Sequence, residues 1–411
     1  MQSGAACFDE EAALAWPLRY TPTWKMPAPP SPALDLPFEI SPIARIVMPV
    51  DTACLSAEDS MNSTPEGSAA PSGAGIQKIR YPRLRIGLVN NMPDGALLAT
   101  ECQFHSLLNA AAKDEFEIEL SFYSLPEIRR SGDADTRVKD CYQSLGKLSS
   151  DSPDALIVTG REPAAAALKD EAYWNSLAQL HDWARENTYS TVWSCLAAHA
   201  AVHHGDGIER TRGPRKLSGV YQCERYSLSP LTRGLPLYFS LPHSRWNGIA
   251  ESALQRHGYQ ILSRGSEVGA DIFVKEYESL FVFFQGHPEY QAETLMLEYC
   301  RDVSRYLSGA SNSLPMIPEN YFAPETEEAL AGIYRKAENC RDKSLEQELM
   351  DVLVNVQVEA PWAPIATRIY KNWLEFIHAQ KCKGKRQRSV AGNHILQVER
   401  SAAGRPNGRM A

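Results

Sequence analysis

The chain has 411 residues, 44% hydrophobic and 22% charged, a composition typical of a globular protein with room for two or three domains. Its 42 Lys and Arg residues against 50 Asp and Glu residues give a net charge of −8, which argues against a general nucleic-acid-binding protein. Uninterrupted apolar stretches stay well short of the roughly 18 residues that a transmembrane helix needs, so no membrane association is expected.

An N-terminal extension comes first. Residues 1–82 are rich in Pro, Ser, Gly and Ala, most densely at 62–75, where we expect a disordered linker. Residues 1–20 lack the basic and apolar regions of a secretory signal peptide. Nine cysteines without a CxxC pair indicate free thiols, so a reducing, cytoplasmic location is expected.

From residue 83 onward, apolar runs of strand length alternate with stretches of helical periodicity. Strands are predicted within 83–91, 116–125, 154–160, 190–194 and 279–284, and helices at 99–115, 173–187, 196–204 and 291–307. The segment between 205 and 278 is expected to be irregular and rich in turns. The alternation predicts an α/β fold, an open, mostly parallel sheet with helices on both faces, whose functional residues follow the carboxyl ends of strands.

The C-terminal part divides in two. Residues 319–380 are predicted to be helical and to complete a domain spanning 83–380. Four large aromatic side chains are available there for packing: Trp362, Tyr370, Trp373 and Phe376. Residues 381–411 hold eight Lys or Arg residues and predict a disordered basic tail. RNA binding by this tail is one interpretation, and a solvated terminus is the favoured one.

Cys195 is the first candidate catalytic residue. It lies where the strand 190–194 ends and an Ala-rich helix begins, so its side chain should reach the carboxyl edge of the sheet. The free N–H groups at the start of a helix stabilise a thiolate, and such surroundings lower a cysteine pKa from about 8.5 towards roughly 3.5–7.5. The alternative is a buried structural cysteine, because free cysteine is among the most buried residue types.

The loop 285–290, QGHPEY, offers partners for that thiol. It directly follows the apolar strand 279–284, so His287 and Glu289 should leave the same edge of the sheet as Cys195. A carboxylate can hold one imidazole nitrogen while the other nitrogen faces a thiol, which predicts a Cys-His-Glu triad. A surface turn is the competing interpretation of this loop.

Seven short blocks in this order resemble the homoserine O-succinyltransferase (homoserine O-acyltransferase) family. They are VNNMP (89–93), DALIVTG (154–160), AYW (172–174), RKLSGVY (215–221), PHSRW (242–246), GHPEY (286–290) and EYCRD (298–302). The similarity spans roughly 83–310 and resumes in ENYFAP (319–324) and IYKNWLEFI (369–377). The resemblance implies a class I glutamine amidotransferase-like fold and O-acylation of L-homoserine for methionine synthesis.

The resemblance also implies a role for each matching residue. Cys195 would be the acyl-accepting nucleophile of a ping-pong reaction, His287 the general acid and base, and Glu289 the carboxylate that orients it. The backbone N–H of Leu196 would donate to the oxyanion. The matching residues that would hold the amino-acid substrate are Lys216, Ser244 and Arg301.

Without the resemblance, Lys216 and Arg301 would be interpreted as solvated charges. His243 and Arg245 flank Ser244 in the PHSRW block, and their roles stay open. No metal is expected. His199, His203 and His204 are interpreted as helix-surface residues, since no carboxylate or cysteine partner is evident for them.

Ala164 falls where the family selects its acyl group: glycine there accompanies succinyl transfer and glutamate acetyl transfer. A small neutral residue leaves room for a longer acid, so succinyl-CoA is the expected co-substrate, with acetyl-CoA as the alternative. No bound cofactor is expected. The expected partners are small-molecule substrates, and the family is compatible with a homodimer.

The first loop departs from the family pattern. Asp94 and Gly95 replace two lysines near the acyl site, so a substitute is needed if those lysines neutralise the oxyanion or grip the thioester. Serine therefore stays open as an acceptor in place of homoserine. Two other functions remain, a glutamine amidotransferase-like hydrolase and a non-catalytic binding protein. The glycines usual beside the nucleophile of the hydrolase are absent here, where Ser194 and Leu196 flank Cys195.

Overall fold

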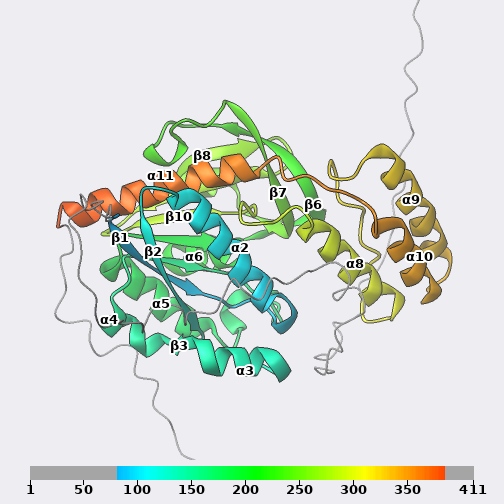
Figure 1. Ribbon diagram of the computed structural model, residues 1–411, viewed down its shortest axis with the longest axis horizontal. Coiled ribbons are helices and arrows are strands. Elements are labelled where there is room, and N and C mark those ends of the chain that lie inside the picture. Colours follow the sequence, from blue (N-terminus) through cyan, green and yellow to red (C-terminus); the bar gives the residue numbers. More distant parts are fainter. Residues whose placement is uncertain (1–80, 385–411) are drawn as a thin grey trace, which may run out of the picture. The chain divides into compact units, whose positions relative to one another are not determined.

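The computed structural model describes residues 81–384 (Figure 1). The predicted extension 1–82 and basic tail 381–411 lie outside these residues, except for 81–82 and 381–384 at their inner ends. Within 81–384, no helix combines the length and the apolar composition that crossing a bilayer requires.

One ten-stranded sheet organises the described chain, in the order β3-β2-β1-β4-β5-β10-β9-β8-β6-β7. Its parallel half consists of β1 (Arg83–Val89), β2 (Glu117–Ser124), β3 (Tyr142–Ser144), β4 (Ala155–Val158), β5 (Ser190–Ser194) and β10 (Leu280–Phe284). β2 and β4 pair with opposite sides of β1, so the direction of strand addition reverses there. In open α/β sheets, such a reversal creates a crevice at the carboxyl ends of the strands.

Helices cover both faces of this sheet, as predicted. Ala155 and Ile157 of β4 belong to the core under α2 (Asp94–Ala112) and α11 (Ala363–Cys382). The alternate residues, Leu156 and Val158, pack on the opposite side with α5 (Trp174–Asn187) and α6 (Leu196–Asp206). This alternation follows from the two-residue period of a strand that is buried on both faces. Helix α2 begins earlier than expected, at Asp94.

The expectation of an irregular segment between 205 and 278 is wrong. It forms the antiparallel half of the sheet, with strands β6 (Thr211–Arg225), β7 (Tyr238–Gly248), β8 (Gln260–Gly265) and β9 (Gly269–Glu276), and the short helix α7 (Glu251–Arg256). β6 is exposed or half-buried along its first half and mostly buried along its second, so no regular alternation of polar and apolar residues marks it. The β6–β7 register also shifts between Arg212 and Leu217, which interrupts the pattern further.

The helical C-terminal part packs in two places. Helices α8 (Thr294–Leu307), α9 (Pro324–Asn339) and α10 (Ser344–Leu353) share an apolar cluster of their own. α11 then returns along the sheet beside α2 (Figure 1). The predicted docking of its aromatic residues is confirmed for three side chains that are almost fully buried: Trp362, Tyr370 and Trp373. Two short helices, α3 (Gly132–Cys141) and α4 (Leu148–Asp151), complete the edge near β3.

Candidate active site

Cys195 lies at the junction between β5 and α6, as the sequence predicts. Its backbone has φ 50° and ψ −110°, a conformation that non-glycine residues rarely adopt and that functional sites often retain. The Cys195 carbonyl accepts a hydrogen bond from the Ala198 N–H at 3.0 Å, which closes the first turn of α6. The thiol is half-buried, so it sits on a tight strand-to-helix turn that does not seal it in the core.

The loop that carries His287 begins at the end of β10, beside the end of β5. β5 and β10 are parallel partners, with Ser194 opposite Phe284. The Cys195 N–H donates to the Phe284 carbonyl at 2.7 Å, which joins the two strand ends. All six residues of 285–290 are buried, so the surface-turn interpretation is wrong.

His287 and Glu289 form a buried pair. The His287 Nδ1 lies 2.8 Å from the Glu289 Oε1, and the Ser194 hydroxyl donates to the same oxygen at 3.3 Å. Tyr290 stacks on the imidazole, with ring centroids 4.2 Å apart. The His287 N–H donates to the Pro242 carbonyl at 2.8 Å. Glu289 and Tyr290 therefore fix the ring, and the backbone bond to Pro242 fixes the loop that carries it.

The electrostatics of this pair favour a charged imidazole. Burial by itself lowers the pKa of His287, but the thiolate form of Cys195, and then Glu289, outweigh it and raise the pKa well above its usual value. A hydrogen bond with the Cys195 side chain acts in the same direction. The thiol, the imidazole and the carboxylate therefore act as one electrostatic unit.

Lys216 and Arg301 both donate hydrogen bonds to Asp302, an acid that the sequence alone did not indicate. The Lys216 Nζ donates to Asp302 Oδ2 at 2.8 Å, and the Arg301 Nε donates to Asp302 Oδ1 at 2.9 Å. Lys216 comes from the irregular part of β6 and Arg301 from α8. The solvated-charge interpretation of both residues is wrong, because each is partly buried against this carboxylate.

Glu298 is a second acid on the same side of α8. The Tyr290 hydroxyl donates to Glu298 Oε1 at 2.9 Å, while Oε2 is buried without a hydrogen-bond partner among residues 81–384. Burial raises the pKa of Glu298, but Arg301, Lys216 and a hydrogen bond from Ser244 together lower it. The three predicted substrate-binding residues thus gather around the carboxylates of Glu298 and Asp302, and one oxygen of Glu298 stays without a partner among residues 81–384.

The N-terminus of α6 approaches the loop after β4 very closely. A Cβ atom at Gly160 would lie 2.9 Å from the Leu196 and Ala197 backbone nitrogens and 2.6 Å from the Leu196 Cβ. Only glycine permits this approach. The N–H groups in the first turn of a helix have no intrahelical acceptor, so Leu196 and Ala197 can donate to a developing negative charge.

The divergent first loop is held by an arginine. Asp94 accepts hydrogen bonds from the Ser131 N–H at 3.0 Å and hydroxyl at 2.8 Å. Arg130 lies 3.3 Å from the Asp94 carboxylate, and its guanidinium also donates to the Asn90 and Met92 carbonyls. Asp94 therefore acts as a structural anchor. Gly95 follows it in the first turn of α2, where an added Cβ would meet open space.

Ala164 is exposed in the loop between β4 and α5. The next residue, Ala165, donates its N–H to Glu171 Oε1 at 2.7 Å. Glu162 lies 3.4 Å from Arg305 of α8. The loop that contains the predicted acyl-selecting position thus contacts the helix that carries Arg301.

His243 and Arg245 lie in a buried network below the His287 loop. Arg245 donates to the Asn247 and Val268 carbonyls at 2.6 Å each, and to His243 Nδ1 at 3.3 Å. The His243 Nε2 lies 3.4 Å from Asp271 Oδ1, which accepts the Gly286 N–H at 3.2 Å. These two residues therefore support the backbone that precedes His287.

The histidines of α6 are not all surface residues. His199 is buried, and its Nε2 lies 3.0 Å from Gln285 Oε1. The His204 Nε2 lies 3.0 Å from Asp182 Oδ1, so the expectation that these histidines lack a carboxylate partner is wrong. His203, half-buried, also has an acid near its Nδ1, at 3.4 Å. These partners lie on α5 and in the segment after α6, which one helix alone could not indicate.

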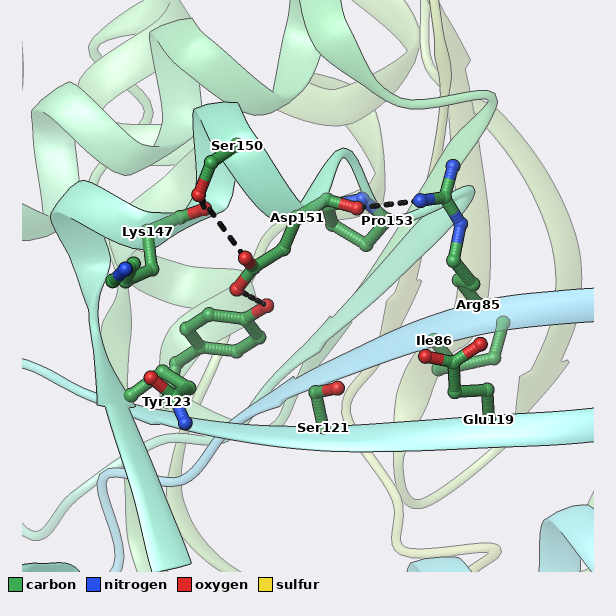
Figure 2. A pocket seen from close by; sticks show the side chains of 10 residues that line it. Arg85, Ile86, Glu119, Ser121, Tyr123, Lys147, Ser150, Asp151 and Pro153 are labelled. Carbon is green, nitrogen blue, oxygen red and sulfur yellow. Dashed lines mark hydrogen bonds between the residues drawn. The ribbon is translucent and has the colours of Figure 1, made fainter.

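A separate hollow of about 410 Å³ lies over β1, β2 and α4 (Figure 2). Asp151 is its most connected residue: its carboxylate accepts the Tyr123 hydroxyl at 2.8 Å, and its carbonyl accepts an Arg85 N–H at 2.8 Å. None of the predicted site residues lines this hollow. The predicted triad of Cys195, His287 and Glu289 lies instead at the ends of β5 and β10.

Comparison with known proteins finds a matching family model and similar named proteins. The family model described as homoserine O-succinyltransferase matches residues 52–383. The homoserine O-succinyltransferase of Bradyrhizobium japonicum is 46% identical over 309 residues, covering 75% of this chain and 94% of that protein. The protein of the same name from Rhodopseudomonas palustris is 43% identical over 291 residues, covering 71% and 87%.

Solved structures share lower similarity. A glutamine amidotransferase from Methylobacillus Flagellatus is 15% identical, with a TM-score of 0.39, and covers 72% of this chain and 96% of that chain. A glutamine amidotransferase from Thermotoga maritima is 13% identical, with a TM-score of 0.36, and covers 67% and 100%.

Proposed function

Because this chain belongs to the homoserine O-succinyltransferase family, we propose that it transfers the succinyl group of succinyl-CoA to the hydroxyl of L-homoserine through a thioester on Cys195. The product, O-succinyl-L-homoserine, would enter methionine synthesis. The observation that carries the proposal is the placement of Cys195 on a strained turn beside the His287–Glu289 pair.

In the first half-reaction, the Cys195 thiolate attacks the thioester carbonyl carbon of succinyl-CoA. The oxyanion is stabilised by the free N–H groups of Leu196 and Ala197 at the start of α6. The bond to the CoA sulfur breaks, and CoA leaves as a thiol with the proton that the His287 imidazolium supplies. One thioester replaces another, so this step is close to balanced in free energy.

Acylation changes the state of His287. The negative sulfur that raises the pKa of His287 is consumed in the thioester, so the pKa of the imidazole falls at that moment. The now neutral Nε2 accepts the proton of the homoserine hydroxyl while its oxygen attacks the thioester carbonyl. Cys195 leaves as a thiolate, and the starting state returns. A positioned base of this kind contributes about 10²–10⁴-fold to the rate.

The acceptor site is proposed to lie along α8. The buried, unpartnered Oε2 of Glu298 suits the ammonium group of an amino acid. Arg301 is held by Asp302 through its Nε and one terminal nitrogen, which leaves Nη1 for the substrate carboxylate. Ser244 and Lys216 border the same space through their contacts with Glu298 and Asp302.

The test is to incubate the full chain with succinyl-CoA alone and measure its intact mass. A succinyl adduct should appear, should vanish on addition of homoserine, and should be absent from Cys195→Ala. The matched control is Cys141→Ala, which removes another half-buried thiol and should retain the adduct. Glutamine hydrolysis without any acyl adduct would refute the proposal, as would an adduct that neither homoserine nor serine discharges.

A further inference from the structure

Two arginines each have a buried guanidinium nitrogen without a hydrogen-bond partner among residues 81–384. Arg161 follows Gly160 in the loop after β4, and Arg210 lies between α6 and β6. The Nη1 atom of each is buried and has no hydrogen-bond partner in the part of the chain that the structure describes. Within 81–384, neither arginine forms an ion pair, whereas Arg130 and Arg301 each contact a carboxylate. Leaving a buried charged donor unpaired costs free energy that a bound anion would recover.

The two arginines share one environment. Burial, and then Glu171, raise the pKa of Tyr173 to about 12, and both Arg161 and Arg210 oppose that rise, which places both charges near the same phenol. Glu171 also acts on Arg210, but from beyond ion-pair distance, and one of its oxygens is occupied by the Ala165 N–H. Both guanidinium groups therefore act on Tyr173, and within 81–384 neither has a carboxylate at ion-pair distance.

This environment adjoins the place where the acyl group would be held. Arg161 is the residue after Gly160, whose Cα approaches the Leu196 and Ala197 N–H groups. Arg161 also belongs to the loop that contains Ala164 and contacts α8 through Glu162. An acyl group whose carbonyl lies at the Leu196 N–H would therefore begin beside the segment Gly160-Arg161.

We propose that Arg161 and Arg210 form the subsite that binds the terminal carboxylate of the succinyl group. This inference rests on the function proposed above and names the residues that select its donor. A guanidinium group donates two parallel hydrogen bonds to a carboxylate, which suits a short dicarboxylic acyl chain. The subsite would also supply positive charge to a site whose first loop carries the acid Asp94.

The test compares the rate constants for acylation of Cys195 by succinyl-CoA and by butyryl-CoA. It separates binding of the terminal carboxylate from other roles of the two arginines. Butyryl-CoA has a methyl group where succinyl-CoA has its carboxylate and is otherwise the same donor. Arg161→Ala and Arg210→Gln should each lower the rate constant for succinylation about 10–100-fold, the usual effect of losing a charged hydrogen bond. Butyrylation should stay within about twofold, which also shows that each variant is folded. Arg161→Lys should restore part of the loss, since a lysine keeps the charge without the fork.

The matched control is Arg212→Ala. Arg212 is two residues from Arg210, but its guanidinium lies 4.2 Å from the Trp246 ring centroid, and neither rate should change. Equal loss with both donors would overturn the inference and assign the arginines to a CoA phosphate or to packing. A wild-type protein that uses succinyl-CoA no better than butyryl-CoA would also overturn it. A wild-type protein that forms no adduct with any acyl-CoA would instead refute the proposed function itself.

Discussion

The amide of Cys195 is hydrogen-bonded to the carbonyl of Phe284 across 2.7 Å. This bond joins the turn that presents the thiol to the last residue of the strand that precedes the His287 loop. The proposed nucleophile and base are therefore positioned by two adjacent parallel strands, although they are far apart in the sequence. Rigid strand ends are better suited to such positioning than mobile loops.

The positive φ of Cys195 predicts the relative stability of two variants at this position. Cys195→Ala and Cys195→Gly should both be unable to form the acyl adduct. Glycine accepts the φ of 50° without strain, which removes about 1–3 kcal/mol, while its greater freedom in the unfolded chain costs about 0.4–1 kcal/mol. In urea unfolding, the glycine variant should therefore be at least as stable as the alanine variant. A clearly more stable alanine variant would show that the turn is unstrained.

The pKa of His287 predicts a dependence of stability on pH. This pKa lies above the value of about 6.5 expected in the unfolded chain, so the charged imidazole stabilises the fold. The contribution is complete below about pH 6.5 and is lost as the pH rises through the pKa of the folded protein. NMR titration of His287 should show a lower pKa in Cys195→Ala, and the pH dependence of the unfolding free energy should weaken, since only Glu289 then raises the pKa. Cys141→Ala should leave both unchanged, and an unaltered His287 pKa in Cys195→Ala would contradict the coupling.

The close approach at Gly160 predicts a specific loss of activity. In Gly160→Ala, the added Cβ would clash with the Leu196 side chain and displace the N–H groups of α6. We expect the acylation rate to fall about 10²–10³-fold, as when an oxyanion donor is lost, and the unfolding free energy to fall by about 1–3 kcal/mol.

Gly332→Ala is the control for this substitution. Gly332 lies inside α9, and a Cβ added there would meet open space. Alanine at this position should therefore raise the unfolding free energy by about 0.5–1 kcal/mol and leave the acylation rate unchanged. If Gly160→Ala retains the wild-type acylation rate, the first turn of α6 is not the oxyanion site.

The shared contact of Lys216 and Arg301 predicts an effect on the acceptor alone. Asp302→Asn removes the charge that holds both cations, so the KM for homoserine should rise about tenfold or more. The rate of Cys195 acylation by succinyl-CoA, which needs no acceptor, should be unaffected. Glu293→Gln, an exposed acid at the start of the same helix, serves as the control and should alter neither. A fall in the acylation rate of Asp302→Asn would place this acid in the donor step.

The sequence predicts the parallel strands β1, β2, β4, β5 and β10, most of which are apolar runs, but misses β3, which is three residues long and mostly exposed. Because β5 and β10 are among the predicted strands, the junction at Cys195 and the loop at His287 could be located from residues alone. β6 and β7 escaped detection, since Pro214 and Pro242 interrupt them and their register shifts. Asp302 follows Arg301 directly, but its partner Lys216 lies 86 positions away, so only the fold reveals the contact.

α8 has two opposite faces, and this has a consequence for how acceptor preference can change. One face carries Glu298, Arg301 and Asp302; the other packs through Tyr299 and Val303 against α9 and α10. The packing of α8 against α9 and α10 therefore helps to fix its orientation. If α8 lines the acceptor site as proposed, substitutions among residues 324–353 that change its orientation would alter which amino acids are accepted, although none of those residues would contact the substrate.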